Sequence, residues 1–322
     1  MQTIPRKNGD ILPDVGAAAE PDLTVLYVSG WCRSGSTVLG NVLAEVPGFF
    51  HAGELRYLWL NGVLGSGSNR RCGCGDQLAV CPVWSKVLAV VTPPDRTPAE
   101  HAAEVVAWQA GCRTRHTWRV LAGRPAGGGW PAVLAATYRA VAEATGAGVV
   151  VDTSKYASDA AWLWRLDGIR PAQLHLVRDP RAVAYSYRRP KAYVERRSAL
   201  DSTLHWVGAN LAAEAVARAH PAASLRVRHE DLTADPRAVV GRVLALAGRP
   251  GAPNPVAPGG TVELGGNHTV TGNPVRFDRG PTRLRDGQGW RTGLPARRRA
   301  LVTAAAWPLL ARYRYLGHSG KD

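Results

Sequence analysis

Residues 23–37 read LTVLYVSGWCRSGST. This stretch begins with a short apolar run rich in β-branched side chains, which is typical of a buried parallel strand. A loop bounded by Gly30 and Gly35 follows, and apolar residues then recur at helical spacing over residues 38–46. The stretch therefore predicts a strand, a tight glycine loop and a helix, in that order.

The same pattern recurs later in the chain. Further strands are predicted over residues 148–152, 173–178 and 225–228. The last two are followed by Asp179-Pro180 and Asp235-Pro236, and proline is common in the first turn of a helix. Strands that alternate with helices predict an α/β fold, a P-loop-like doubly wound parallel sheet flanked by helices. An amphipathic helix is also predicted, with an apolar face made of Leu200, Leu204, Val207, Leu211 and Ala215.

The other segments indicate how the domain is organised. Residues 1–21 show no periodicity and are predicted to be a flexible arm, so that residues 22–322 form a single domain. Residues 61–130 contain clustered cysteines, several tryptophans and a capping-box pattern from Thr97 to Glu100, which predict a largely helical insertion. We expect this insertion to cap the ligand edge of the sheet. A final helix is predicted over residues 296–316.

Composition excludes several classes of protein. Hydrophobic residues make up 45% and charged residues 20% of the chain, which argues against a wholly disordered or fibrous protein. No run approaches about 18 consecutive apolar residues, and the first residues lack the apolar region of a signal peptide. We therefore expect a cytoplasmic protein without a membrane span. Five cysteines at scattered spacing do not describe a secreted disulfide framework.

The net charge of +15 is carried mainly by arginine, which supplies 35 of the 40 basic residues. Genome composition explains such an excess, and so does a need for planar guanidinium groups that bind phosphate or sulfate oxygens. Charge alone also suggests a non-catalytic nucleic-acid-binding protein, but no nucleic-acid motif supports that alternative. The sequence thus predicts no nucleic-acid partner and carries no indication of the oligomeric state.

The glycine loop has the context of an anion site. Between a strand and a helix, backbone N–H groups and the positive helix end face the same point. Compared with the nucleotide loop G-x-x-x-x-G-K-[ST], the chain has Ser36 where the lysine belongs, and Arg33 supplies the cation instead. The missing lysine counts against binding of the ATP β- and γ-phosphates with Mg²⁺. The alternative is a strand-to-helix turn without a ligand.

Two motifs carry a resemblance to a known family. Residues 33–37, RSGST, resemble the 5′-phosphosulfate loop of sulfotransferases that use 3′-phosphoadenosine 5′-phosphosulfate (PAPS). Arg178 at a strand end and Ser186 in the next helix resemble the pair that grips the 3′-phosphate of this donor. The resemblance implies PAPS as co-substrate and no metal. The implied donor-binding residues are Arg33, Ser34, Gly35, Ser36, Thr37, Arg178 and Ser186.

Other positions resemble protein-tyrosine sulfotransferases and related bacterial enzymes. In that subgroup a Gly-Glu segment supplies the catalytic carboxylate, which implies this role for Glu54, and Arg56 matches another of its residues. Lys155 lies where the subgroup places a lysine that contacts the donor. Arg276 lies in a segment, residues 272–276, that resembles a loop of bacterial members expected to close over the nucleotide.

Sulfuryl transfer needs in-line geometry, charge stabilisation and a base, and the sequence offers a candidate for each. Glu54 would accept the proton of the acceptor hydroxyl, Arg33 with the loop amides would stabilise the transferring group, and Lys155 would contact the bridging oxygen. The expected acceptor is a small molecule, a secondary metabolite, with a carbohydrate, a glycolipid or a protein tyrosine as alternatives. A Mg²⁺-dependent kinase is a further alternative, because residues 149–152 imitate a Walker B strand.

Several assignments remain open at this level. Glu54 is also compatible with an ion pair to Arg56. Arg56, His51 and His268 are candidate contacts of the acceptor, and the two histidines are also rival bases. Asp152 can instead cap the following helix.

The cysteines leave three hypotheses. Their spacing is not that of paired C-x-x-C knuckles, so structural zinc, a local disulfide and free thiols stay possible, although the catalytic assignment includes no metal. These residues are Cys72, Cys74, Cys81 and Cys112, whereas Cys32 is expected to pack in the interior.

Overall fold

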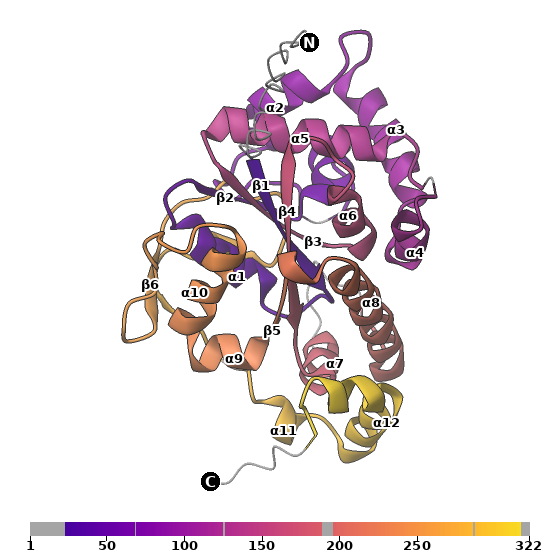
Figure 1. Ribbon diagram of the computed structural model, residues 1–322, viewed down its shortest axis with the longest axis vertical. Helices are drawn as coiled ribbons and strands as arrows, with labels where there is room; N and C mark the ends of the chain where they lie inside the picture. Colours follow the sequence, from indigo (N-terminus) through magenta and orange to yellow (C-terminus); the bar gives the residue numbers. More distant parts are fainter. Residues whose placement is uncertain (1–22, 68, 125, 189–195, 286, 317–322) are drawn as a thin grey trace, which may run out of the picture.

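The computed structural model describes residues 23–67, 69–124, 126–188, 196–285 and 287–316, so the arm predicted over residues 1–21 lies outside it. A parallel sheet with strand order β2-β3-β1-β4-β5 forms its centre (Figure 1). This confirms the predicted α/β fold. The strands are β1 (Leu23–Gly30), β2 (Phe49–Gly53), β3 (Val149–Lys155), β4 (Ile169–Val177) and β5 (Ser224–Arg228).

Alternation along β1 explains why helices cover both faces of the sheet. Every residue of β1 is buried, and successive side chains of a strand point to opposite faces. Val25 and Tyr27 belong to one apolar cluster, and Leu26 and Val28 belong to another. The first cluster includes side chains of α2 (Trp84–Val91), α3 (Pro98–Ala110), α5 (Trp130–Thr145) and α6 (Ala157–Leu163). The second includes side chains of α1 (Ser36–Ala44), α9 (His229–Ala234) and α10 (Pro236–Leu246).

The strand β2 is absent from the sequence-based prediction, which had only a helix end at residues 47–48 followed by site residues. Its five residues, FFHAG, are too few and too mixed to show a strand period. Pairing with β3 defines it, because Phe49, Phe50 and His51 align with the apolar start of that strand. Its consequence is that Glu54 follows directly at the carboxyl end of an edge strand.

Residues 61–130 are largely helical, as predicted, and Thr97 caps α3. The Thr97 Oγ1 accepts from the Glu100 N–H at 3.3 Å, and Glu100 Oε2 accepts from the Thr97 N–H at 2.9 Å. The helices of this insertion pack on one face of the sheet, and residues 69–77 reach the carboxyl end of β2. The expectation that the insertion caps the ligand edge of the sheet stays a prediction. The insertion also contains α4 (Thr117–Leu121).

The helix α8 (Ala199–Ala219) is confirmed, but the predicted apolar face is wrong. Leu200, Leu204 and Leu211 are 41%, 56% and 44% exposed. The buried face instead carries Trp206 and polar side chains such as Asn210, whose Oδ1 lies 2.8 Å from His175 Nε2 on β4. Polar side chains that bond to the sheet therefore decide which face is buried, and the hydrophobic period does not show this.

The remaining elements complete the C-terminal half. The short strands β6 (Thr261–Leu264) and β7 (Gly280–Arg283) pair antiparallel. The last helix, α12 (Ala296–Arg312), ends before the predicted residue 316. Within the described residues, no helix is long and apolar enough to span a membrane. The other helices of the C-terminal half are α7 (Pro180–Arg188) and α11 (Trp290–Gly293).

Short 3₁₀ or π turns occur along the whole described chain, at Leu55–Tyr57, Leu58–Val63, Leu78–Val80, Thr114–His116, Pro221–Ala223 and Pro274–Phe277.

Three buried histidines predict that acid destabilises the fold. Burial lowers the pKa of His51 and His229 to about 3 and that of His175 to about 4. Below about pH 6.5 the unfolded chain takes up protons that the folded chain does not, so the free energy of unfolding falls as pH falls. Each histidine accounts for about 2 kcal/mol between pH 6.5 and pH 5. Urea unfolding at pH 7, 6 and 5 measures this loss.

The variant His175→Gln tests whether this histidine causes part of the pH dependence. Its free energy of unfolding should depend less steeply on pH than that of the wild type, and an unchanged slope would contradict the assignment. Asp152 acts in the opposite direction, because burial raises its pKa to about 6. The folded chain then holds a proton that the unfolded chain has lost, which favours folding as pH falls from 6 toward 4. This single group offsets only part of the loss caused by the histidines.

Candidate active site

The loop between β1 and α1 is built on positive backbone φ angles. Gly30, Arg33 and Gly35 have φ values of 133°, 70° and 90°. A Cβ on Gly30 would overlap the Leu176 carbonyl, and a Cβ on Gly35 would lie 2.6 Å from His229 Nδ1. Gly35 occupies the N-cap of α1 and has no side chain to bind the free N–H groups of the first helical turn. These amides are therefore available to an anion.

The structure brings the two predicted donor motifs into direct contact. Arg33 Nε donates to Ser186 Oγ at 2.9 Å, and Arg178 Nη1 donates to the Arg33 carbonyl at 3.0 Å. Arg33 comes from the glycine loop, Arg178 follows β4 and Ser186 lies in α7. Residues more than 140 positions apart in the sequence thus surround one point at the carboxyl edge of the sheet.

A buried ion pair lies at the carboxyl ends of β2 and β3. Lys155 Nζ is 2.5 Å from Glu54 Oε1, and it also donates to the Thr153 carbonyl at 2.6 Å. Burial lowers the pKa of Lys155, but the neighbouring acidic groups, with Glu54 foremost, together outweigh this effect and hold the pKa above its usual value. Lys155 adopts a φ of 74°, a conformation rarely used by residues with a side chain. Backbone strain of this kind is found at functional sites more often than in ordinary turns.

The ion pair lies beside the glycine loop. Burial raises the pKa of the Cys32 thiol, while the positive charges of Lys155 and Arg33 lower it and the charge of Glu54 raises it. Cys32 therefore lies within electrostatic reach of both groups of site residues. One base candidate, one ammonium and one guanidinium thus share a single region, and their roles stay predictions. The Cys32 side chain is half-buried rather than fully packed in the interior.

Backbone groups of residues 270–273 contact both Thr37 and Glu54. Asn273 N–H donates to Thr37 Oγ1 at 3.3 Å, and Gly272 approaches Thr37 closely. The Val270 carbonyl accepts from the Glu54 N–H at 2.8 Å, and a Cβ on Gly53 would overlap that carbonyl. Thr37 and Glu54 are therefore both held by residues 270–273.

His51 is buried between other side chains. It is 1% exposed, with Nδ1 3.1 Å from Asn41 Oδ1 and Nε2 3.3 Å from Thr153 Oγ1. Burial first, and then the positive charges of Lys155 and Arg276, lower its pKa to about 3. Both ring nitrogens are engaged inside the protein, so the geometry does not favour His51 as the rival base.

Arg56 has a structural environment. It donates to both Asp159 carboxylate oxygens at 2.7 and 2.8 Å, and to the carbonyls of Gln109 and Cys112 at 2.5 and 2.7 Å. It is 5% exposed. The alternative of an ion pair between Glu54 and Arg56 is therefore wrong: Glu54 pairs with Lys155, and Arg56 joins the insertion to α6. This geometry does not support the predicted contact of Arg56 with an acceptor.

Arg276 and His268 also lie away from the predicted contacts. Arg276 is 1% exposed and donates to the carbonyls of Thr269 and Arg71 at 2.9 and 2.8 Å. Its guanidinium therefore stabilises the segment beneath the glycine loop. His268 Nδ1 lies 3.2 Å from Cys81 Sγ rather than beside Glu54 and Lys155.

Asp152 is not arranged as a Walker B carboxylate. It is 1% exposed, its Oδ2 accepts from the Tyr138 hydroxyl at 2.7 Å, and its Oδ1 accepts from the Ser154 N–H and hydroxyl at 2.7 and 2.5 Å. Its interactions stabilise the end of β3. Tyr156, and not Asp152, occupies the N-cap of the next helix, so the capping hypothesis is wrong as well.

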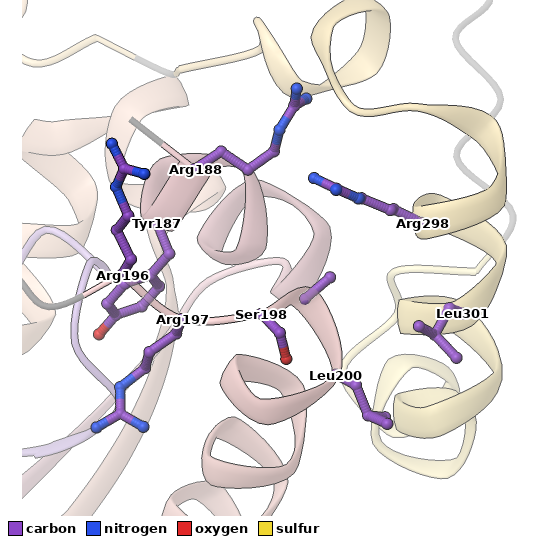
Figure 2. A pocket seen from close by; sticks show the side chains of 9 residues that line it. Tyr187, Arg188, Arg196, Arg197, Ser198, Leu200, Arg298 and Leu301 are labelled. Carbon is purple, nitrogen blue, oxygen red and sulfur yellow. The ribbon is translucent and has the colours of Figure 1, made fainter. Parts of the chain in front are cut away.

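Sequence patterns did not reveal a pocket at the C-terminal end of α7. It has a volume of about 450 Å³ and lies between α7, the start of α8 and α12. Figure 2 shows Arg188 and Arg298 extending from opposite walls of this pocket. Nothing in the local sequence joins these two arginines, because they lie 110 positions apart. The lining residues are Tyr187, Arg188, Arg196, Arg197, Ser198, Ala199, Leu200, Arg298 and Leu301.

Comparison with known proteins identifies the fold. Neither a scan of protein-family models nor a search of curated proteins gave a match. Among solved structures, the sulfotransferase domain of the Synechococcus PCC 7002 olefin synthase is 21% identical and has a TM-score of 0.50, covering 89% of this chain and 94% of that one. The sulfotransferase domain from the curacin biosynthetic pathway is 18% identical with a TM-score of 0.51, covering 88% and 96%. The chain thus has the fold of these sulfotransferase domains.

Proposed function

We propose that the protein is a sulfotransferase that moves the sulfuryl group of PAPS to a hydroxyl of a small-molecule acceptor. The observation that carries the proposal is the contact of Arg33 with Ser186 and Arg178. It joins a loop suited to a 5′-phosphosulfate with a strand-end arginine and a helix hydroxyl suited to a 3′-phosphate. The shared fold with sulfotransferase domains supports the same conclusion.

The site residues have the donor set that an anionic nucleotide requires. The free amides at the start of α1 and the hydroxyls of Ser36 and Thr37 suit the 5′-phosphate. Arg178 and Ser186 suit the 3′-phosphate, and the Arg33 guanidinium can bridge between the two ends of the site. The residues present therefore fit PAPS, which supplies an activated sulfuryl group with the nucleotide phosphate as leaving group.

The ion pair provides the chemistry of proton and charge transfer. An ammonium has three N–H groups, and the Lys155 ammonium uses two of them on Glu54 and on the Thr153 carbonyl. The third can stabilise the bridging oxygen as its bond to sulfur breaks. Glu54 accepts the proton of the acceptor hydroxyl while the new sulfur–oxygen bond forms, so charge and protons balance. The products are the sulfate ester and 3′-phosphoadenosine 5′-phosphate.

A small-molecule acceptor is proposed because the two similar solved structures are sulfotransferase domains of an olefin synthase and of the curacin biosynthetic pathway. The pocket of about 450 Å³ does not carry this assignment, because Glu54 is not among its lining residues. Secondary metabolites are the first class to test, with carbohydrates or glycolipids next and protein tyrosine after them. A panel of acceptors with labelled PAPS identifies the class directly.

Calorimetric titration tests the donor. We expect heat of binding with PAPS and with 3′-phosphoadenosine 5′-phosphate, and much weaker binding of ATP with Mg²⁺, because Ser36 replaces the P-loop lysine and Asp152 is buried. Binding of ATP with Mg²⁺ alone would reject the proposal in favour of a kinase.

The variant Ser186→Ala should bind 3′-phosphoadenosine 5′-phosphate roughly tenfold to a hundredfold more weakly, because it loses a hydrogen bond to a charged phosphate. Titration calorimetry gives the dissociation constant. Ser202→Ala also removes a serine hydroxyl, from a buried position in the neighbouring helix α8, and serves as the control. Equal affinities in the two variants would remove Ser186 from the donor site.

The variant Glu54→Gln should lose about 10²- to 10⁴-fold in kcat, since a general base contributes on this scale. Binding of 3′-phosphoadenosine 5′-phosphate should stay within about threefold of the wild type, because the carboxylate faces the acceptor in this proposal. Glu143→Gln, at an exposed position, controls for the loss of one negative charge. Unchanged turnover would assign proton removal to another group.

A further inference from the structure

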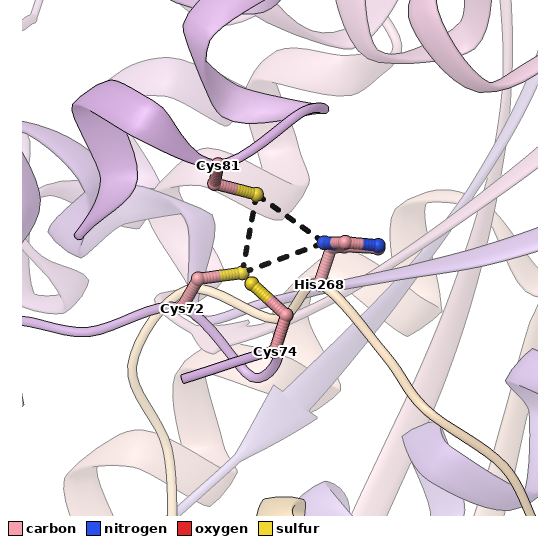
Figure 3. A group of neighbouring side chains, drawn as sticks. All are labelled: Cys72, Cys74, Cys81 and His268. Carbon is pink, nitrogen blue, oxygen red and sulfur yellow. Dashed lines mark hydrogen bonds between the residues drawn. The ribbon is translucent and has the colours of Figure 1, made fainter. Parts of the chain in front are cut away.

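Three cysteines and one histidine converge away from the candidate active site. The ligand atoms of Cys72, Cys74, Cys81 and His268 all lie within 4.8 Å of one another. His268 Nδ1 is 3.2 Å from Cys81 Sγ and 3.8 Å from Cys72 Sγ, and those two sulfurs are 3.5 Å apart. Figure 3 shows the four side chains pointing toward a common centre.

These separations match tetrahedral zinc. Zinc binds thiolate at about 2.3 Å and imidazole nitrogen at about 2.0–2.1 Å, which places the sulfur and nitrogen atoms of a tetrahedral Cys₃His set about 3.5–3.8 Å apart. The three distances among Cys72, Cys81 and His268 lie at or near this range. With Cys74 as fourth ligand the set is Cys₃His, a combination used by structural zinc sites.

The backbone holds the cysteine turn in place independently of any metal. Cys72 N–H donates to the Asp76 carbonyl at 2.8 Å, and Gly75 N–H donates to the Cys72 carbonyl at 2.9 Å. Gly73 N–H donates to the Thr269 carbonyl at 2.9 Å, which joins the turn to the residue after His268. Because these backbone bonds already position the ligands, metal binding costs little conformational entropy.

The histidine is positioned from the other side. Trp84 Nε1 donates to the His268 carbonyl at 2.6 Å. A Cβ on Gly73 would overlap Asn267 Oδ1, so only glycine between the first two cysteines permits this approach. Two segments nearly 200 residues apart in the sequence are thereby brought into one ligand set.

The surrounding charges also favour a metal-thiolate centre. Zinc with three thiolates and a neutral imidazole carries a net charge of −1. Three arginines bond to carbonyls of the ligand segments: Arg71 to Gly75, Arg276 to Thr269 and Arg279 to Gly73. Their guanidinium groups are a positive environment for that negative centre. A disulfide would use two of the cysteines, and it would not explain why the third cysteine and His268 lie beside them.

We propose that Cys72, Cys74, Cys81 and His268 bind one structural Zn²⁺ ion. Four protein ligands leave no open position, so the ion would stabilise the fold rather than take part in catalysis. It would fasten residues 72–81 to the segment whose Val270 holds the Glu54 backbone. This proposal revises the sequence-based expectation of a protein without metal, while the proposed catalytic chemistry remains metal-free.

Metal analysis of the purified full chain tests the proposal. Protein produced in zinc-containing medium and dialysed without chelator should contain about one zinc per chain. His268→Ala and Cys74→Ser should each retain less than half of that zinc. Cys32→Ser and His205→Ala remove the same groups outside the cluster and should keep it. Cys74 is exposed, so its variant is expected to fold, which circular dichroism verifies.

Cobalt substitution gives a spectroscopic measurement of the ligands. Replacing zinc by Co²⁺ should produce the visible ligand-field bands of tetrahedral cobalt together with thiolate-to-cobalt charge transfer, and Cys74→Ser should weaken the charge-transfer band. Removal of zinc should lower Tm by about 8 °C or more, because a tightly bound ligand stabilises only the folded state.

Two outcomes overturn the proposal. One is a wild-type chain without zinc that also shows no thiolate-to-cobalt band on titration with Co²⁺. The other is a disulfide between Cys72 and Cys81 found by mass spectrometry in protein handled under reducing conditions. Both outcomes are independent of nucleotide binding, so this proposal and the proposed enzymatic function succeed or fail separately.

Discussion

The backbone of Val270 is the connection on which the candidate site depends. Its N–H donates to the Ala52 carbonyl and its carbonyl accepts from the Glu54 N–H, both at 2.8 Å. It also forms a β-bridge with Cys72 on the insertion. Gly53 is required for this arrangement, because any side chain there would displace the Val270 carbonyl. The position of the proposed base is thus set by a segment more than 200 residues further along the chain.

Two buried ion pairs show how similar chemistry is divided between structure and function. Arg56 faces Asp159 and two carbonyls, so its donors are taken up within the protein and the cost of burying its charge is offset. Lys155 has fewer acceptors, a strained backbone and a partner carboxylate that is 17% exposed. A buried charge with incomplete pairing is unfavourable in isolation, and an anionic ligand is one way to relieve it. This difference distinguishes the Glu54–Lys155 pair from a purely structural one.

The sequence predicts those parts of the molecule that local rules determine. The strand, glycine loop and helix over residues 23–44 follow from apolar spacing and from glycine alone, whereas the Arg178–Ser186 pair was identified by its resemblance to sulfotransferases. The edge strand β2 and the buried face of α8 were not predicted, because pairing with β3 and polar contacts with β4 decide them. His268 gave no local signal for its place beside the cysteines. Only the folded chain brings residues 72–81 and 268 together.

Arginine chemistry explains more of the composition than charge does. Arg56, Arg276 and Arg279 direct their guanidinium groups at backbone carbonyls in loops and at the end of a helix, where the carbonyls of Gln109 and Thr269 also accept a backbone N–H. Lysine cannot replace them, because a single ammonium does not reach two carbonyls in a fixed plane. Some of the positive charge therefore results from fastening loops together rather than from attracting an anion. The charges that face the proposed nucleotide are few, and they are distinguished by position, at the carboxyl edge of the sheet beside the start of α1.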